Sequence, residues 1–478
     1  MLILSASMGA GHDGVAQELA RRLRSRGLAV EVLDILSLLP GVVGRGLRGG
    51  YALMLRWAPW LYDLIFRVWF EPRGGGGPVS PITVLAERKV RRWVADHQPA
   101  LAVSTFHLCS AVLAGLRRRG ELPVPSASVV VDPAVHRLWV DPDVDLHVCL
   151  HRLSAAEARR RGAPRATAPG PFVRPDFTDP SWDRHGARTS LGLGPDDRVV
   201  LLVAGSWGSG DIANTLSLVQ QSPHLTPVVV CGADERLRRR LARQVARSGR
   251  RCLVMGWVDD MARLMVAADV VVENAGGLTA MEALALGRPV VSFHPIPGHG
   301  RANVAAMARA GVAAWVTEDD QLVPTLERVS APGPLRHSLV SAGSQLLASD
   351  PTDDLLGLLA PTAGDGGEAA LERHRSPRAA TSSGGNSGPP GPSEARNRRL
   401  TRVRNRRQSR ERRRRRLLGG VPLWSRHRRQ GRVRRPEPLL SRVSLRNVPS
   451  WRRSGPPRPR HRAHRPAGRR RLADLRPG

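Results

Sequence analysis

The stretch DVVVENAGGLTAMEALALGRPVVSFHPIPGHGRAN, from Asp269 to Asn303, decides the fold. Apolar runs at 270–272 and 289–293 predict two buried parallel strands, and the segment 278–286 between them predicts a helix. Glycines where a strand passes into a helix let backbone N–H groups approach an anion, and the helix dipole attracts a phosphate. The stretch therefore predicts a phosphate site, with an ordinary strand–turn–helix as the alternative.

The predicted helix carries Thr279 and Glu282, which are three residues apart and so share one face. A carboxylate on that face can accept hydrogen bonds from two vicinal hydroxyls, such as those of a ribose. The alternative is a surface glutamate without a ligand.

The same alternation of apolar run, turn and helical pattern extends upstream. Further strands are predicted at 199–204, 227–230 and 252–255, which makes an open parallel sheet covered by helices. The loop GSWGSGD, with Gly205 and Ser206, is a second glycine-rich candidate for binding phosphate.

The N-terminal half begins with a similar unit. A strand at 2–5 is followed by SASMGAGHDG and by a helical pattern at 15–23. Gly9 and Gly11 make a candidate phosphate loop, although the spacing is not the dinucleotide fingerprint. His12 lies near a helix N-terminus, where the dipole favours a neutral ring that can accept a proton. This suits a general base that acts on an alcohol, and a helix-capping histidine is the alternative.

An aromatic segment, GYALMLRWAPWLYDLIFRVWF, occupies residues 50–70, and Pro59 must break or kink any helix there. Its mixture of apolar, aromatic and basic residues favours a bilayer interface over a pair of core helices. The candidate acceptor or membrane residues in it are Trp57, Trp60, Tyr62 and Trp69. Asp132, His136 and Trp139 follow a strand predicted at 127–131, on the usual ligand side of such a sheet.

The net charge of +33 and the pI near 11.7 suggest nucleic acid as a partner, but the distribution of charge argues against it. Residues 361–478 carry 34 Arg and 7 acidic residues, a net of +27, which leaves +6 for residues 1–360. This segment has no periodicity and predicts a disordered tail. It could bind anionic lipid, serve as a plain extension, or be out-of-frame translation of GC-rich DNA.

Four widely spaced cysteines, without metal spacing, predict free thiols in a reducing cytoplasm. The N-terminus lacks the basic region of a signal peptide, so none is predicted. The sequence also has no run of 18 uncharged apolar residues, so no transmembrane helix is predicted.

Six segments, in order over roughly residues 1–350, carry a resemblance to a known family. They are SASMGAGHDG, WAPWLYDLIFRVWF, AVHRLWVDPDVD, GPFVRPDF, MGWVDDMARLMVAADVVV and ENAGGLTAMEALALGRPVV. Together they resemble the diacylglycerol glycosyltransferases, a family that includes monogalactosyldiacylglycerol synthase and processive diacylglycerol glucosyltransferases. The resemblance extends more distantly to the N-acetylglucosaminyltransferase that makes lipid II.

The resemblance implies an α/β fold of the GT-B type, with two Rossmann-like domains that face a cleft. Residues 1–172 would bind the lipid acceptor and residues 196–350 the UDP-sugar donor. The reaction would invert the anomeric centre without a metal or other cofactor, on the inner, cytoplasmic face of the cell membrane, where the chain would be peripheral and contact anionic lipid.

The resemblance also implies roles for single residues: His12 as the base and Trp139 on the acceptor side. His299 stands where the family usually has glutamine, which leaves the identity of the hexose open. The implied donor-binding residues are Gly205, Ser206, Trp257, Val258, Gly276, Gly277, Thr279, Glu282, His299 and Asn303.

Three alternatives remain open at this point. A lipid-II-type N-acetylglucosaminyltransferase would use the same architecture. A UDP-sugar 2-epimerase would share both sheets but would not need the aromatic segment. A nucleic-acid-binding protein would place its affinity in residues 361–478.

Overall fold

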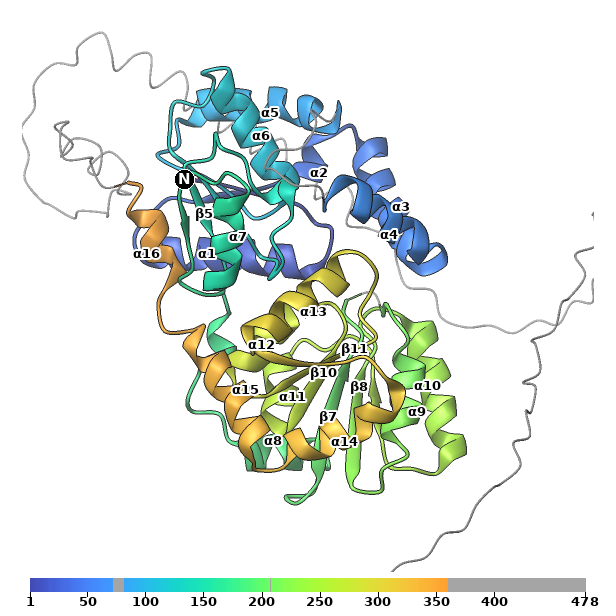
Figure 1. The fold of residues 1–478 in the computed structure, drawn as a ribbon. Helices are drawn as coiled ribbons and strands as arrows, with labels where there is room; N and C mark the ends of the chain where they lie inside the picture. The colour runs from blue at the N-terminus through green and yellow to red at the C-terminus, as the bar shows by residue number, and fades with distance from the viewer. Residues whose placement is uncertain (72–80, 207, 360–478) are drawn as a thin grey trace, which may run out of the picture. The chain divides into compact units, whose positions relative to one another are not determined.

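The computed structural model describes residues 1–71, 81–206 and 208–359, and the predicted tail at 361–478 lies outside them (Figure 1). The described chain contains two parallel six-stranded sheets. The strands of the first, in the order β2-β1-β3-β4-β5-β6, are β1 (Leu2–Ser5), β2 (Glu31–Asp34), β3 (Ala102–Ser104), β4 (Ser126–Val129), β5 (Leu146–Val148) and β6 (Ala166–Thr167). Those of the second, in the order β12-β11-β10-β7-β8-β9, are β7 (Arg198–Val203), β8 (Leu225–Val230), β9 (Leu253–Met255), β10 (Val270–Glu273), β11 (Val290–Phe293) and β12 (Ala313–Val316).

Helices connect the strands, and the long connection between β2 and β3 includes two consecutive helices at 41–57 and 59–69. The helices of the first domain are α1 (Ala10–Ser25), α2 (Ile35–Leu38), α3 (Gly41–Trp57), α4 (Pro59–Trp69), α5 (Pro81–His97), α6 (His107–Arg118), η1 (Arg137–Trp139) and α7 (Arg152–Arg160). Those that follow are η2 (Pro175–Phe177), α8 (Arg184–Ser190), α9 (Ile212–Val219), α10 (Glu235–Ser248), α11 (Met261–Ala267), α12 (Leu278–Ala285), α13 (His299–Ala310), α14 (Asp319–Ser330), α15 (Pro334–Gln345) and α16 (Pro351–Leu356).

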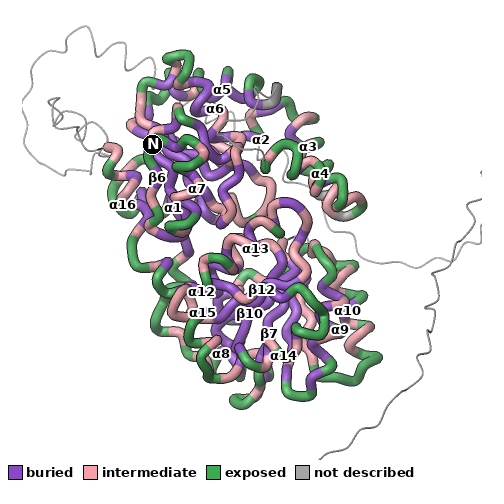
Figure 2. The backbone as a smooth tube through the Cα atoms, in the orientation of Figure 1, coloured by how far each residue is buried: buried purple, intermediate pink, exposed green. Residues whose placement is uncertain are grey.

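Both faces of each sheet are buried, which explains why the central strands are continuous apolar runs. Along β7, Val199 and Leu201 pack on one face with α11 and α12, whereas Val200 and Leu202 pack on the other face with α9 and α14. The strands accordingly form the buried centre of each domain, and the outer sides of the helices are exposed (Figure 2). The predicted α/β architecture with two parallel sheets is confirmed.

Several predicted boundaries were wrong. Helix α1 begins at Ala10 rather than near residue 15, so Gly11 lies in its first turn and Gly9 is its N-cap. Strands β5, β6 and β12 were not predicted. Of the break or kink expected at Pro59, the structure shows a break: α3 ends at Trp57 and Pro59 begins α4.

The end of the described chain returns to the first domain. Leu355 of α16 belongs to the same apolar cluster as Leu19 of α1. Arg22 of α1 donates to the Asp350 carboxylate at 2.9 Å and to the Val173 carbonyl at 2.7 Å. The first domain is thus completed by a helix that follows the second domain in the chain.

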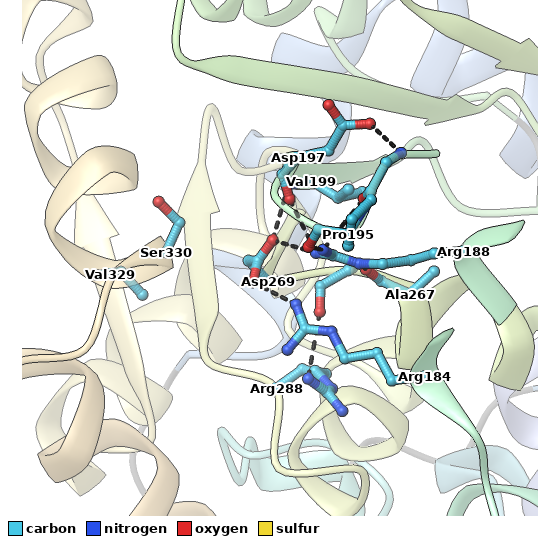
Figure 3. A network of polar contacts seen from close by, with 12 residues as sticks. Arg184, Arg188, Pro195, Asp197, Val199, Ala267, Asp269, Arg288, Val329 and Ser330 are labelled. Atoms are coloured by element: carbon cyan, nitrogen blue, oxygen red, sulfur yellow. Dashed lines mark hydrogen bonds and ion pairs between the residues drawn. The ribbon is translucent and has the colours of Figure 1, made fainter. Parts of the chain in front are cut away.

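A buried ionic network fixes the start of the stretch at 269–303 (Figure 3). Asp269 is 9% exposed, and its carboxylate accepts from Arg188 and from the backbone N–H of Val199, both at 2.8 Å. Arg184 also pairs with it. The network connects α8 to the adjacent strands β7 and β10. It therefore fixes the position of β10 and of the glycine turn that follows this strand.

Candidate active site

A cavity of about 760 Å³ is lined by residues from both domains, at the carboxyl ends of β1, β4, β7, β9 and β10. Of the residues predicted from the sequence, those that line it are Gly9, Gly11, His12, Tyr62, Gly205, Ser206, Trp257, Val258, Gly277, Thr279, Glu282, His299 and Asn303. Gly276, Trp57, Trp60, Trp69 and Trp139 are not among the lining residues.

His12 lies in the first turn of α1, with its ring edge-on to Phe106 at a centroid distance of 4.8 Å. Its Nδ1 is 3.0 Å from the backbone carbonyl oxygen of Thr105. Because a carbonyl oxygen can only accept, Nδ1 carries the proton of the neutral ring, and Nε2 is left as the acceptor. The cavity therefore contains an oriented imidazole with the polarity that a general base requires.

Trp139, which was expected on the acceptor side, is fully buried and does not line the cavity. Its indole N–H donates to Asp132 at 2.9 Å, and its ring packs in an apolar cluster with Val130 and Val140. A tryptophan whose N–H is satisfied internally and whose ring is enclosed acts as core. Trp139 thus holds Asp132, and Asp132 is the residue that faces the cavity.

Asp132 connects the two domains through Asn303. The Asn303 amide donates to Asp132 at 3.0 Å, and its oxygen accepts from the Ala134 N–H at 3.1 Å. Burial disfavours the charged form of Asp132, but His12, His299 and further groups outweigh it and lower the pKa of the carboxyl. Asn303 was predicted near the sugar, and the structure shows that its amide also joins α13 to the segment after β4.

The glycines after β7 and β10 adopt conformations that only glycine takes easily. Gly205 has φ 67° and Gly276 has φ 64°. A Cβ on Gly276 would lie 2.7 Å from the Cβ of Asn303, so a glycine here allows the turn after β10 to pack closely against Asn303 of α13. Gly277 and Thr279 lie on the cavity side, at the N-terminus of α12.

Glu282 lies one turn into α12 and is 7% exposed. Burial raises the pKa of its carboxyl to about 7, opposed by Arg174, whose Nη2 is 3.8 Å away, and reinforced by Asp176. Arg174 also lines the cavity and was not predicted as a site residue. Trp257, 57% exposed, and Val258 follow β9 at the same end of the second sheet.

His299 is the first residue of α13, and its Nδ1 is 2.9 Å from the hydroxyl of Tyr62. Tyr62, one of the candidate acceptor or membrane residues, is only 7% exposed and lines the cavity from α4. On the other side of α3 and α4, Trp57, Trp60 and Trp69 are 72%, 68% and 51% exposed. The aromatic segment therefore has an outer apolar face and an inner face toward the cavity.

Comparisons with known proteins agree with this arrangement. Residues 12–169 match the family model of monogalactosyldiacylglycerol (MGDG) synthase, and residues 200–328 match that of glycosyl transferases group 1. The chain is a glycosyltransferase with a first domain of the MGDG synthase type. The resemblance to diacylglycerol glycosyltransferases that the motifs indicated is thereby confirmed.

Relatives of this glycosyltransferase include a processive diacylglycerol beta-glucosyltransferase of Bacillus subtilis (strain 168), 25% identical over 52% of the chain and 65% of the relative. Another, of the same description, from Bacillus cereus, is 22% identical over 68% of the chain and 84% of the relative. The crystal structure of Arabidopsis thaliana UGT89C1 complexed with UDP-L-rhamnose is 13% identical, with a TM-score of 0.50 over 75% of this chain and 97% of the other. That likeness shows the fold alone, and it agrees with the predicted GT-B architecture.

Two further findings apply to residues 1–71, 81–206 and 208–359 of the glycosyltransferase, the part that the structure describes. Within these ranges, no helix has the length and apolar character of a membrane span. Nor do the His, Cys, Asp and Glu side chains of this part of the chain form a group of three or more suited to a metal ion.

Proposed function

We propose that the chain transfers a hexose from a UDP-sugar to diacylglycerol or a similar lipid alcohol, with inversion at the anomeric carbon. The observation that carries this proposal is the single cavity that His12 and Glu282 share, one from each domain. The Bacillus relatives are named diacylglycerol beta-glucosyltransferases, which supports a lipid acceptor and makes glucose the first sugar to test.

In the proposed reaction, the acceptor hydroxyl lies against Nε2 of His12. The hydroxyl oxygen attacks the anomeric carbon in line, the bond from that carbon to the UDP oxygen breaks, and the hydroxyl proton passes to Nε2. The hydrogen bond from Nδ1 to the Thr105 carbonyl supports this direction of transfer, because it fixes the ring with Nε2 as the acceptor. A single displacement of this kind inverts the centre.

The second domain would bind UDP. The Glu282 carboxylate would accept from the ribose hydroxyls, and Trp257 with Val258 would flank the uracil. The diphosphate gains charge as it leaves, and N–H groups at Ser206 and at the start of α12 would stabilise it. We propose that no metal ion takes part, which predicts that a chelator leaves the rate unchanged.

We also propose that the outer face of α3 and α4 docks on the inner, cytoplasmic surface of the membrane. Large apolar side chains are exposed there together, which is typical of an interfacial surface. They are Leu53, Trp57, Trp60, Leu64, Val68 and Trp69. Because Tyr62, on the other face of α4, lines the cavity, this orientation would present the cavity to a lipid hydroxyl at the membrane surface.

The decisive experiment compares wild type with His12→Ala. Full-length protein is incubated with labelled UDP-glucose, UDP-galactose or UDP-N-acetylglucosamine and diacylglycerol vesicles, and the labelled lipid is measured. The variant should lose transfer by a factor of about 100 or more while its UDP affinity stays within about twofold, because the base acts only in the chemical step. His185→Ala, an exposed histidine on α8, is the matched control. Normal turnover by His12→Ala would refute the assignment, and labelled sugar released without a lipid product would refute the acceptor.

A further inference from the structure

Helix α4 contacts the second domain through its inner face. The Tyr62 hydroxyl is 2.9 Å from Nδ1 of His299. The next residue, Asp63, accepts from the backbone N–H of Gly298 at 3.0 Å and lies 3.3 Å from Nη1 of Arg301. Two adjacent residues of one domain thus hold the first turn of α13 in the other.

The approach of the two segments is close. Gly298 has φ 68°, and a Cβ there would lie 2.8 Å from Cε1 of Tyr62 and 3.0 Å from the Cβ of Phe66. Any larger residue would push α4 away from the loop before α13. The contact between Tyr62 and His299 therefore depends on surfaces that fit at van der Waals distance, as well as on one hydrogen bond.

We propose that Tyr62 is a positioning residue for His299 and thereby sets the selectivity of the donor site for the hexose. The inference rests on the proposed function and on the expectation that His299, which lines the cavity, is a donor-binding residue that contacts the hexose. With Nδ1 occupied by Tyr62, Nε2 is the ring atom left for a hydroxyl in the cavity. Tyr62 acts through His299, because the phenol occupies Nδ1 and so fixes the orientation of the ring and the face that Nε2 presents.

The surroundings of the pair support a fixed, uncharged donor–acceptor unit. Burial raises the pKa of Tyr62 far above its ordinary value, so the phenol stays protonated, and Tyr62 is also hydrogen-bonded to Tyr51. Burial lowers the pKa of His299, and the nearby Asp132 only partly opposes this. A neutral ring held in one orientation distinguishes hexoses by the direction of one hydroxyl, which a mobile ring would not do.

The test measures donor binding without an acceptor. Dissociation constants for UDP, UDP-glucose and UDP-galactose, which differ in the sugar alone, are determined by calorimetry for wild type, Tyr62→Phe and a control. Trp93→Phe is a suitable control, because it removes an aromatic hydrogen-bond donor to Glu31 at a site that does not line the cavity. Tyr62→Phe should weaken the preferred sugar nucleotide about 3- to 10-fold, bring the ratio of the two hexoses toward one, and leave UDP within about twofold.

A double-mutant cycle sharpens the result. In a His299→Gln background, Tyr62→Phe should have no further effect on hexose binding, because the ring that it positions is gone. Unchanged hexose selectivity in Tyr62→Phe would overturn the proposal, as would an equal loss of UDP affinity, which indicates a merely structural role. A wild-type protein that binds no UDP would instead refute the donor half of the proposed function.

Discussion

Replacing Glu282 by glutamine should stabilise the protein at alkaline pH and impair UDP binding in the same variant. The ordinary pKa of a glutamate is 4.5, and burial raises that of Glu282 to about 7. The folded protein therefore holds this proton more tightly than the unfolded chain does. Its contribution to stability is full below pH 4.5 and is lost as the pH rises through 7.

The magnitude follows from the interval between the two pKa values. Each pH unit within it is worth about 1.4 kcal/mol, so the ionised carboxylate costs about 3 kcal/mol of stability above pH 7. Glutamine has a similar shape and no charge to desolvate. The stability advantage of Glu282→Gln over wild type should therefore grow by about 2–3 kcal/mol between pH 5 and pH 8.5, or roughly 4–12 °C in melting temperature.

Thermal and urea unfolding of both proteins without nucleotide, at pH 5, 7 and 8.5, would measure this difference, and calorimetry would measure UDP binding. UDP affinity should fall about 10- to 100-fold, since a charged acceptor is lost. Glu235→Gln is the control: Arg238 lowers the pKa of that exposed carboxyl to about 2, so its pH-dependent contribution is lost only below pH 4.5, and its stability difference from wild type should stay constant between pH 5 and pH 8.5. A stability difference for Glu282→Gln that is constant from pH 5 to 8.5 would refute the reasoning.

Two further predictions concern the buried network and the exposed aromatic face. Asp269→Asn should lower the free energy of unfolding by about 3–5 kcal/mol, because it leaves the buried Arg188 guanidinium without its carboxylate. Urea unfolding measures this loss, and a loss below about 1 kcal/mol would contradict the prediction. Trp60→Ala should weaken sedimentation with vesicles of diacylglycerol and anionic lipid about 10- to 100-fold at unchanged UDP affinity; vesicle binding equal to that of wild type would contradict docking through α4.

The sequence predicted the central strands well because each is an apolar run buried on both faces. The strand at 290–293 agrees closely with the structure, and its neighbour at 270–273 differs by one residue. The strands that were missed lie at or near the sheet edges. β6 has only two residues. β12 is an edge strand with two alanines and the exposed Trp315, so it lacks the run of buried β-branched residues that marks the central strands.

In the candidate site, the contacts between residues close in the sequence could be predicted, and those between residues far apart in the sequence could not. Thr279 and Glu282 could be paired from the sequence, because three residues along a helix place two side chains on one face. Tyr62 and His299 are 237 positions apart, and Asn303 and Asp132 are 171 apart. No spacing rule connects such residues, since their contact depends on how two separately folded sheets pack.

Two buried carboxyls in one cavity also show why residue type alone does not define a site. Asp132 receives hydrogen bonds from Trp139 and Asn303, and nearby histidines help to lower its pKa, so it remains ionised and anchors both partners. Burial dominates the pKa of Glu282, because the Arg174 guanidinium, 3.8 Å away, only partly opposes it and Asp176 acts in the same direction as burial. Hydrogen bonds from ribose hydroxyls would supply what Glu282 lacks and favour its ionised form. In the proposed enzyme, one carboxylate therefore holds the domains together before any ligand arrives, and the other becomes fully charged when the donor binds.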